Sequence, residues 1–195
     1  HRLDEKELNM VLLKNRKYRK GFSLLELILV LGVIAGLIVS AFMIYPKAQA
    51  AQRAEIEVKN ITAIVSEINA IYGSSTNYTG INARTLIDAK IIPSQMRVGN
   101  TYQVVNIWKG PVSFSYSNHG FNITYGNVPS VECAKLVLAT ASIFSNISVG
   151  DNEGYDEEGN EVGTSGTVKQ GVKNVDEVTK YCSNEMNVIS FGFGY

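Results

Sequence analysis

The stretch FSLLELILVLGVIAGLIVSAFMIY, residues 22–45, holds a single charged side chain, Glu26, within 24 residues. As an α-helix this stretch would be about 36 Å long, which exceeds the roughly 30 Å hydrocarbon core of a bilayer. We therefore predict a helix that can cross a membrane. Basic residues crowd the segment before it, which predicts that the preceding end stays in the cytoplasm and the bulk of the chain lies outside.

Two simpler explanations of this stretch compete with one that gives Glu26 a function. A secretory signal peptide has an apolar core of about 7–15 residues, shorter than this run, although AQA at 48–50 offers a small-residue cleavage pattern. A plain single-pass anchor explains everything except Glu26. An acid within a membrane helix costs about 2.5–3.5 kcal/mol on insertion scales, so it indicates a function and a cationic partner at the same depth.

The apolar segment itself offers no lysine or arginine as that partner. A free amino terminus could serve if the chain were cut between Gly21 and Phe22. The sequence KGFSLLELILVLGVIAG, residues 20–36, resembles the class III signal sequence of type IV prepilins and pseudopilins. The resemblance implies cleavage between Gly21 and Phe22 by a prepilin peptidase, then N-methylation of Phe22. Glu26 would pair with the Phe22 ammonium group of a neighbouring copy and set its axial register.

Small residues and one proline interrupt the apolar stretch. Gly32, Gly36 and Ser40 recur at every fourth position, a pattern that lets helices approach closely in lipid, although ordinary glycine usage in membrane helices explains it equally well. Pro46 removes a backbone donor and is expected to kink or locally loosen the helix.

An apolar stripe follows at helical spacing and predicts an amphipathic helix that ends at Gly73. Its members are Ala54, Val58, Ile61, Val65, Ile68 and Tyr72. Together the two parts predict one helix over residues 22–72. We expect a cleaved leader at 1–21, a membrane and filament-core helix at 22–46, and a globular head at 47–195 that includes the amphipathic half.

Composition excludes some classes of protein. The chain has 195 residues, 45% of them hydrophobic, which suits one domain plus an accessory segment. The 18 basic and 18 acidic residues argue against a nucleic-acid-binding protein. Seven of the basic residues and three acids precede Phe22, so the remainder carries 11 basic and 15 acidic side chains. The sequence begins with His1, and Met10 is an alternative start.

The two cysteines, Cys133 and Cys182, lie far apart and have no paired cysteine motif or histidine-rich companion. This spacing disfavours a zinc site and favours one structural disulfide formed in an oxidising compartment. Two unpaired core thiols are the alternative. The sequence shows no phosphate loop, serine elbow or Cys-His arrangement, so we expect neither an enzyme nor a cofactor. The acidic segment 151–161 lacks EF-hand spacing, and a solvated hairpin tip is favoured there over a calcium site.

The remaining segments predict a mixed α and β head. Helices are expected over 82–93, with Asn82 as N-cap, over 129–147, and over 174–182, with Asn174 as N-cap. Strands are expected at 101–108, 112–117, 121–125 and 189–195. The segment 118–120 predicts a hairpin turn, which places His119 in the turn rather than at a ligand site.

These features extend the resemblance to most of the chain. The leader, the segment NYTGINARTLIDAKIIP at 77–93, a cysteine early in a second helix and another before a terminal strand are similar to type IVb pilins, the group that includes the bundle-forming and toxin-coregulated pilins. Phe22 departs from the methionine, leucine or valine frequent there. The implied fold is α+β: a long N-terminal helical spine packed on an antiparallel β-sheet head, with a C-terminal region closed by a Cys133–Cys182 disulfide.

The resemblance also implies a function. The chain would be the major subunit of a type IVb pilus, made in the inner membrane and assembled with copies of itself into an extracellular filament for adhesion, aggregation and host colonisation. Its partners would be a prepilin peptidase and methyltransferase, an inner-membrane platform, an assembly ATPase and a host-surface receptor. A minor pilin and a type II secretion pseudopilin are alternatives within the family. A membrane-tethered periplasmic binding protein is the alternative from another class.

Overall fold

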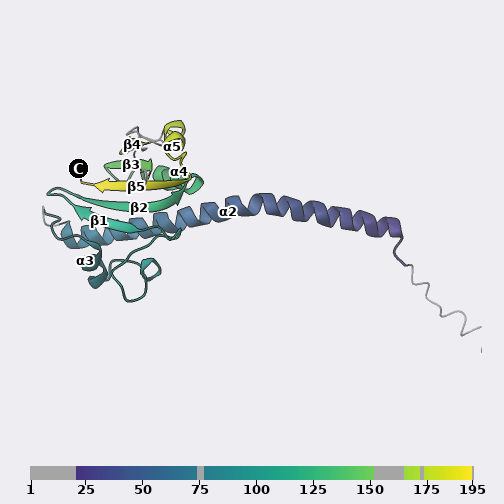
Figure 1. Ribbon diagram of the computed structural model, residues 1–195, viewed down its shortest axis with the longest axis horizontal. Helices are drawn as coiled ribbons and strands as arrows, with labels where there is room; N and C mark the ends of the chain where they lie inside the picture. The colour runs from purple at the N-terminus through teal and green to yellow at the C-terminus, as the bar shows by residue number, and fades with distance from the viewer. Residues whose placement is uncertain (1–20, 74–76, 152–164, 172–173, 195) are drawn as a thin grey trace, which may run out of the picture. The chain divides into compact units, whose positions relative to one another are not determined.

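The computed structural model describes residues 21–73, 77–151, 165–171 and 174–194. The chain divides into two compact units, His1–Tyr45 and Pro46–Tyr195. Helix α2 spans Leu24–Tyr72, 49 residues, and contributes to both units (Figure 1). The side-chain oxygen of Ser23 accepts the Leu25 N–H at 3.2 Å, which satisfies one of the free amide groups of the first turn.

The second unit contains a five-stranded antiparallel sheet with the strand order β1-β2-β5-β3-β4. The strands are β1 (Val112–Tyr116), β2 (Phe121–Pro129), β3 (Asn146–Asp151), β4 (Gly166–Lys169) and β5 (Met186–Phe193). Strand β5, the last in sequence, lies in the middle of the sheet and pairs with both β2 and β3 (Figure 1).

Short helices complete the second unit. They are α3 (Ala83–Asp88), the 3₁₀ turn η1 (Ser94–Met96), α4 (Ser130–Thr140) and α5 (Val175–Tyr181). The side chain of Asn82 accepts the Thr85 N–H at 2.9 Å, and that of Asn174 accepts the Glu177 N–H at 3.3 Å. Both expected N-caps are therefore confirmed.

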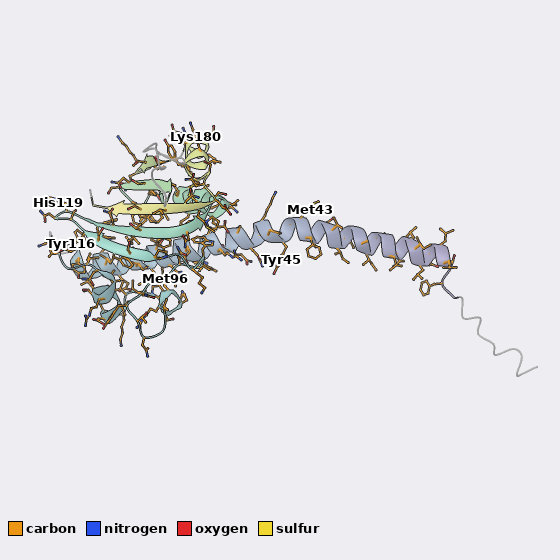
Figure 2. The ribbon with its side chains drawn as sticks, viewed as in Figure 1. Met43, Tyr45, Met96, Tyr116, His119 and Lys180 are labelled. Atoms are coloured by element: carbon orange, nitrogen blue, oxygen red, sulfur yellow. A yellow bond between two sulfur atoms is a disulfide. The ribbon has the colours of Figure 1, made fainter. Side chains whose placement is uncertain are left out.

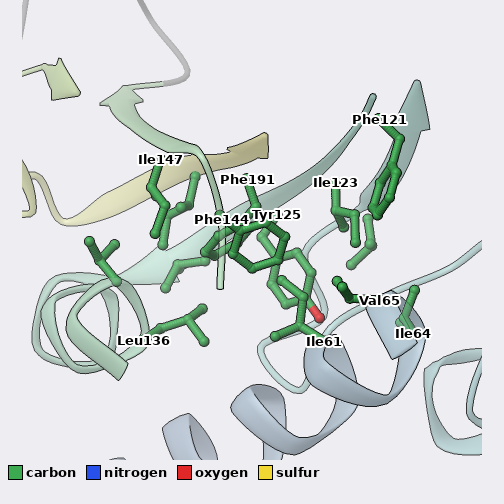
Figure 3. Close-up of a cluster of buried hydrophobic side chains, with 14 of the residues drawn as sticks. Ile61, Ile64, Val65, Phe121, Ile123, Tyr125, Leu136, Phe144, Ile147 and Phe191 are labelled. Carbon is green, nitrogen blue, oxygen red and sulfur yellow. The ribbon is translucent and has the colours of Figure 1, made fainter. Parts of the chain in front are cut away.

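One face of the sheet is buried against α2 and α4. Alternation along the strands places Phe121, Ile123, Tyr125, Ile189 and Phe191 on this face, all fully buried. They join a single cluster with Ile61, Ile64, Val65 and Ile68 of α2 and Leu136 and Val137 of α4 (Figure 3). The aromatic rings of Phe144 and Phe191 have centroids 5.0 Å apart. Burial of each such side chain contributes about 1.5–3 kcal/mol, so this layer supplies much of the stability of the head.

Several sequence expectations about single elements were wrong. Residues 101–108 do not form a strand: Val104 and Val105 make only isolated bridges to Arg97 and Pro111. The second helix ends at Thr140 rather than at 147, and residues 146–151 form β3. The helix after Asn82 ends at Asp88, well before Pro93, and Lys90 has a φ of 58° just beyond its cap. Strand β5 begins at Met186, three residues before the expected start.

Candidate assembly site

The first part of α2 is an apolar surface that the described residues leave uncovered. Every large apolar side chain from Leu24 to Tyr45 is exposed, with exposed fractions between 43% and 78%. Figure 2 shows Met43 and Tyr45 projecting from the helix. Among the described residues, this is the one helix long and apolar enough to cross a membrane. Soluble proteins rarely expose an apolar surface of this size to water, so it indicates contact with lipid or with other protein.

Glu26 lies in the first turn of α2, inside this apolar surface. The ion pair found within the described residues joins Lys59 and Glu55 at 3.0 Å, so the described part of the chain gives Glu26 no cationic partner. The peptide bond between Gly21 and Phe22 is exposed, and the Phe22 side chain is 80% exposed. The predicted cleavage point is thus accessible, one helical turn from Glu26.

The glycines of the apolar segment face open space. A Cβ atom added at Gly32 or Gly36 would meet no other atom within 4 Å. The Ser40 hydroxyl donates to the Gly36 carbonyl at 2.9 Å, so its hydrogen-bond donor is satisfied within the helix. Contacts within the described chain therefore do not account for these small residues. Helix α2 continues through Pro46, and the kink expected there stays a prediction.

A buried polar group on α2 was missed by the sequence interpretation. Glu57 is 1% exposed, and its Oε1 accepts the Ile107 N–H at 2.8 Å. One turn later, the side-chain oxygen of Asn60 accepts from the Gln95 side chain at 3.1 Å. Both partners belong to the segment between α3 and β1, so two hydrogen bonds attach this irregular segment to the helix.

Among the described residues, Glu57 has no cationic partner. Its Oε2 and the Tyr125 hydroxyl are both buried and form no hydrogen bond of standard geometry, but the two side chains interact, and this contact lowers the pKa of Glu57. Figure 3 shows the Tyr125 hydroxyl directed toward α2 beside Ile61. Burial raises the pKa of Glu57 above its ordinary value of 4.5, and the Ile107 N–H lowers it by less. Burial, together with the neighbouring Glu57 charge, raises the pKa of Tyr125 well above 10.

A second hydrogen-bonded centre shapes the same irregular segment. The Asn106 side chain donates to the Gly126 carbonyl at 2.7 Å and accepts the Trp108 and Gly110 N–H groups at 3.1 and 2.9 Å. These contacts turn the chain tightly before β1 and fasten it to β2. Nothing in the sequence pattern marked Asn106, because its role depends on strands that meet only in the folded chain.

The disulfide expected between Cys133 and Cys182 is present, with a Cα–Cα distance of 5.7 Å. It joins the first part of α4 to the residue that follows α5. Beside it, the fully buried Asn187 donates to the carbonyls of Val128, Cys182 and Asn184. Covalent and hydrogen-bonded links thus close the C-terminal region onto the sheet.

No group of three or more potential metal ligands occurs within the described residues. The acidic segment 151–161, weighed above as a calcium site, lies outside the described residues apart from the backbone of Asp151. The calcium alternative therefore stays untested.

Comparison with known proteins places this arrangement in a family. A family model described as PilS N terminal matches residues 51–192, which include the buried half of α2 and all of the sheet except Phe193. The chain belongs to the PilS family of type IVb pilins. As a pilin it is a structural subunit and not an enzyme.

Individual relatives are distant. The major structural subunit of the bundle-forming pilus of Escherichia coli O127:H6 is 24% identical over 126 residues, which are 63% of this chain and 65% of that protein. The same values hold for its counterpart in Escherichia coli O111:H-. The match thus spans just under two thirds of the length of these relatives.

The fold is shared with a solved pilin. The type IVb pilin from Salmonella typhi superposes with a TM-score of 0.54 at 17% identity, covering 72% of this chain and 99% of that one. The predicted fold class, a long helix packed on an antiparallel sheet with a disulfide-closed C-terminal region, is confirmed.

Proposed function

We propose that this pilin is the major subunit of a type IVb pilus, held in the inner membrane as a precursor and then assembled into a surface filament. The observation that carries the proposal is the exposed apolar part of α2, which contains Glu26 as its one charge. Such a surface needs a membrane before assembly and the same surface of other copies afterwards. Pilin homologues assemble in this way, which supports the proposal.

Assembly would depend on one charge pair. Cleavage between Gly21 and Phe22 leaves an amino terminus at Phe22, and N-methylation keeps it cationic. In the low dielectric of the filament core, an unpaired carboxylate or ammonium group costs several kcal/mol. Glu26 of an incoming copy therefore pairs with the Phe22 amine of a neighbour, and only one axial position satisfies both charges.

Helix packing would follow from the same segment. The open faces of Gly32 and Gly36 allow a second helix to approach closely, as small residues do in lipid. Pro46 leaves one backbone carbonyl without its usual donor, so the helix can bend there when the head is packed against its neighbours.

The precursor requires machinery that it does not contain. A prepilin peptidase with methyltransferase activity would process Gly21 and Phe22, and an inner-membrane platform with an ATPase would extract the processed subunit. The filament would serve adhesion, aggregation and host colonisation, with a host-surface receptor as a further partner. The name of the Escherichia coli relatives, subunits of a bundle-forming pilus, supports the aggregation role.

Mass spectrometry and electron microscopy of sheared surface material test the proposal. The expected result is abundant fibres made mainly of this chain, beginning at N-methylated Phe22. Fibres that contain this chain only in traces would assign it to a minor pilin, and secretion defects without long fibres would assign it to a pseudopilin. A product that begins after Ala50 would identify a cleaved signal peptide and refute the proposal.

A matched pair of variants tests the charge pair. Glu26→Val should leave the precursor in the membrane but abolish fibres, because the neighbouring amine would stay buried and unpaired. Leu31→Val, a change of similar size in the same apolar segment, should form fibres normally. Normal fibres from Glu26→Val would contradict the pairing.

A further inference from the structure

The face of the sheet opposite the core carries a continuous row of hydroxyl groups. Strand pairing aligns one Ser or Thr from each of the five strands. In sheet order they are Ser113, Thr124, Ser190, Ser148 and Thr167. With strands about 4.8 Å apart, the row extends about 19 Å across the sheet.

A second row beside it is also small and polar. Pairing aligns Ser115, Asn122, Gly192, Asn146 and Lys169 in the same sheet order. A Cβ atom at Gly192 would lie 2.5 Å from the Asn146 side-chain oxygen and 3.0 Å from that of Asn122. The two carboxamides therefore lie over the central glycine, so no long side chain projects from the middle of this surface. We call the two rows together the outer face.

The outer face holds its side chains by contacts across the strands. The Thr124 hydroxyl donates to that of Ser190 at 3.3 Å, and the hydroxyls of Ser148 and Thr167 are also 3.3 Å apart. The side chains at the two sides of the sheet, such as those of Ser113 and Thr167, are exposed to solvent. The core rows of the same strands are buried, so among the described residues the outer face is the surface of the sheet that stays at least partly exposed.

Charge separates this face from the rest of the chain. From Phe22 onward the chain carries 15 acidic and 11 basic side chains, so filaments of it repel one another at neutral pH. Of the ten residues of the outer face, only Lys169, on the edge strand, is charged. Two copies that approach through this face therefore bring only one charged side chain each, Lys169, to the edge of the contact.

The chemistry of the outer face is complementary to itself. Each hydroxyl both donates and accepts a hydrogen bond, and each carboxamide has both functions in one group. An identical surface turned about a twofold axis therefore offers donors and acceptors to the hydroxyl and carboxamide groups, which suits an isologous contact. The face carries no aromatic side chain and a single cation, so it suits neither stacked bases nor a phosphate backbone.

We infer that the outer face is a lateral contact between copies of this chain in neighbouring filaments, and that it holds filaments together in bundles. The inference rests on the proposed filament and names the surface through which filaments would aggregate. One polar contact of this kind is weak, but a filament presents the face many times, and simultaneous contacts multiply the strength of association.

Charges placed on the face test the inference. Full-length Thr124→Lys and Ser148→Glu variants should form fibres like those of the wild type. Each alone should lose bundles by at least about tenfold in low-speed sedimentation and electron microscopy, since both faces of the contact then carry the same added charge. Mixed together, the two kinds of fibre should bundle with each other. Thr179→Lys, an exposed threonine on α5 away from the sheet, is the matched control and should bundle like the wild type.

Salt provides an independent readout. Bundles held by uncharged hydrogen-bonding groups should persist when the ionic strength is raised, whereas bundles of the mixed variants should dissolve. Wild-type fibres that stay single, or variant fibres that bundle normally, overturn the inference while the proposed pilus stands. Two other outcomes would also overturn the inference. Loss of fibres in both variants would place the face inside the filament. Variants that keep their bundles but lose binding to a neutral glycan, measured with the same fibres, would assign the face to a carbohydrate. Failure of the wild type to form fibres overturns the proposed function itself.

Discussion

Replacement of Glu57 tests how α2 holds the irregular segment before β1. The carboxylate is 1% exposed, accepts the Ile107 N–H at 2.8 Å and has no cationic partner among the described residues. In Glu57→Gln the amide oxygen can still accept this N–H, but the side chain no longer titrates. In Glu57→Leu the N–H is left buried without an acceptor. The two variants therefore separate the hydrogen bond from the charge.

The hydrogen bond sets the difference between the two variants. A buried amide without an acceptor costs about 1–3 kcal/mol, so Glu57→Leu should be less stable than Glu57→Gln by that amount at every pH. The charge sets the pH dependence. Burial raises the pKa of Glu57 above 4.5 in the folded state, so between 4.5 and the raised value the folded chain binds a proton that the unfolded chain has lost.

The sign follows from this difference in bound protons. The unfolding free energy of the wild type should fall as pH rises through that interval, by up to about 1.4 kcal/mol per pH unit. Glu57→Gln should not show this fall. The two proteins should be equally stable below the interval, and the variant should be the more stable one above it.

Urea unfolding of the full-length chain in mild detergent, followed by Trp108 fluorescence between pH 4 and 8, measures both effects. Glu67→Gln, an exposed change on the same helix, is the control and should follow the wild type at each pH. A wild-type pH slope that survives in Glu57→Gln would show that another group titrates. Equal stability of the Gln and Leu variants would show that the Ile107 contact does not hold the segment.

Two further changes probe the closed C-terminal region and the apolar helix. Reduction of the Cys133–Cys182 bond should lower the unfolding free energy by about 4 kcal/mol, which is the loop-closure entropy for a separation of 49 residues. Urea unfolding with and without reductant measures this loss. A loss below about 1 kcal/mol would mean that the Asn187 hydrogen bonds alone constrain the region. Gly36→Leu should leave the precursor stable in the membrane, because a side chain there meets open space. It should reduce the fibre yield, because the larger side chain blocks the close approach of a second helix, whereas Val33→Leu should give a normal yield. Equal fibre yields by electron microscopy would make Gly36 an ordinary membrane-helix glycine.

Local signals in the sequence predicted the elements whose cause is local. The apolar run and the stripe after it predicted α2, and the residues around His119 predicted the β1–β2 hairpin. Asn82 and Asn174 act as the expected N-caps because a short side chain reaches an amide within its own turn. The spacing of the two cysteines favoured a disulfide over a zinc site, with unpaired thiols as the alternative, and the bond is present.

Errors arose where distant pairing decides the structure. The expected helix ran on to residue 147, but α4 ends at Thr140 and pairing with β5 draws residues 146–151 into β3. The alternation of Ile147 and Val149 was the signal that could have shown it. The apolar stripe that predicted the buried side of α2 did not include Glu57 or Asn60, although both are buried. Glu57 is bonded to the Ile107 backbone amide, 50 residues away, and Asn60 to the Gln95 side chain, 35 residues away; no helical periodicity encodes either contact. The cleavage site, Glu26 and the small residues of α2 stay predictions.

The central position of β5 has a consequence for the timing of folding. Strands β2 and β3 both hydrogen-bond to residues 186–193, so neither has its inner neighbour until that part of the chain is available. In the proposed pilus, a chain stalled during export would keep two strand edges and the Phe191 site of the core exposed, and proteases or chaperones could recognise it. Completion of the sheet would then act as a check that only fully exported subunits enter a fibre.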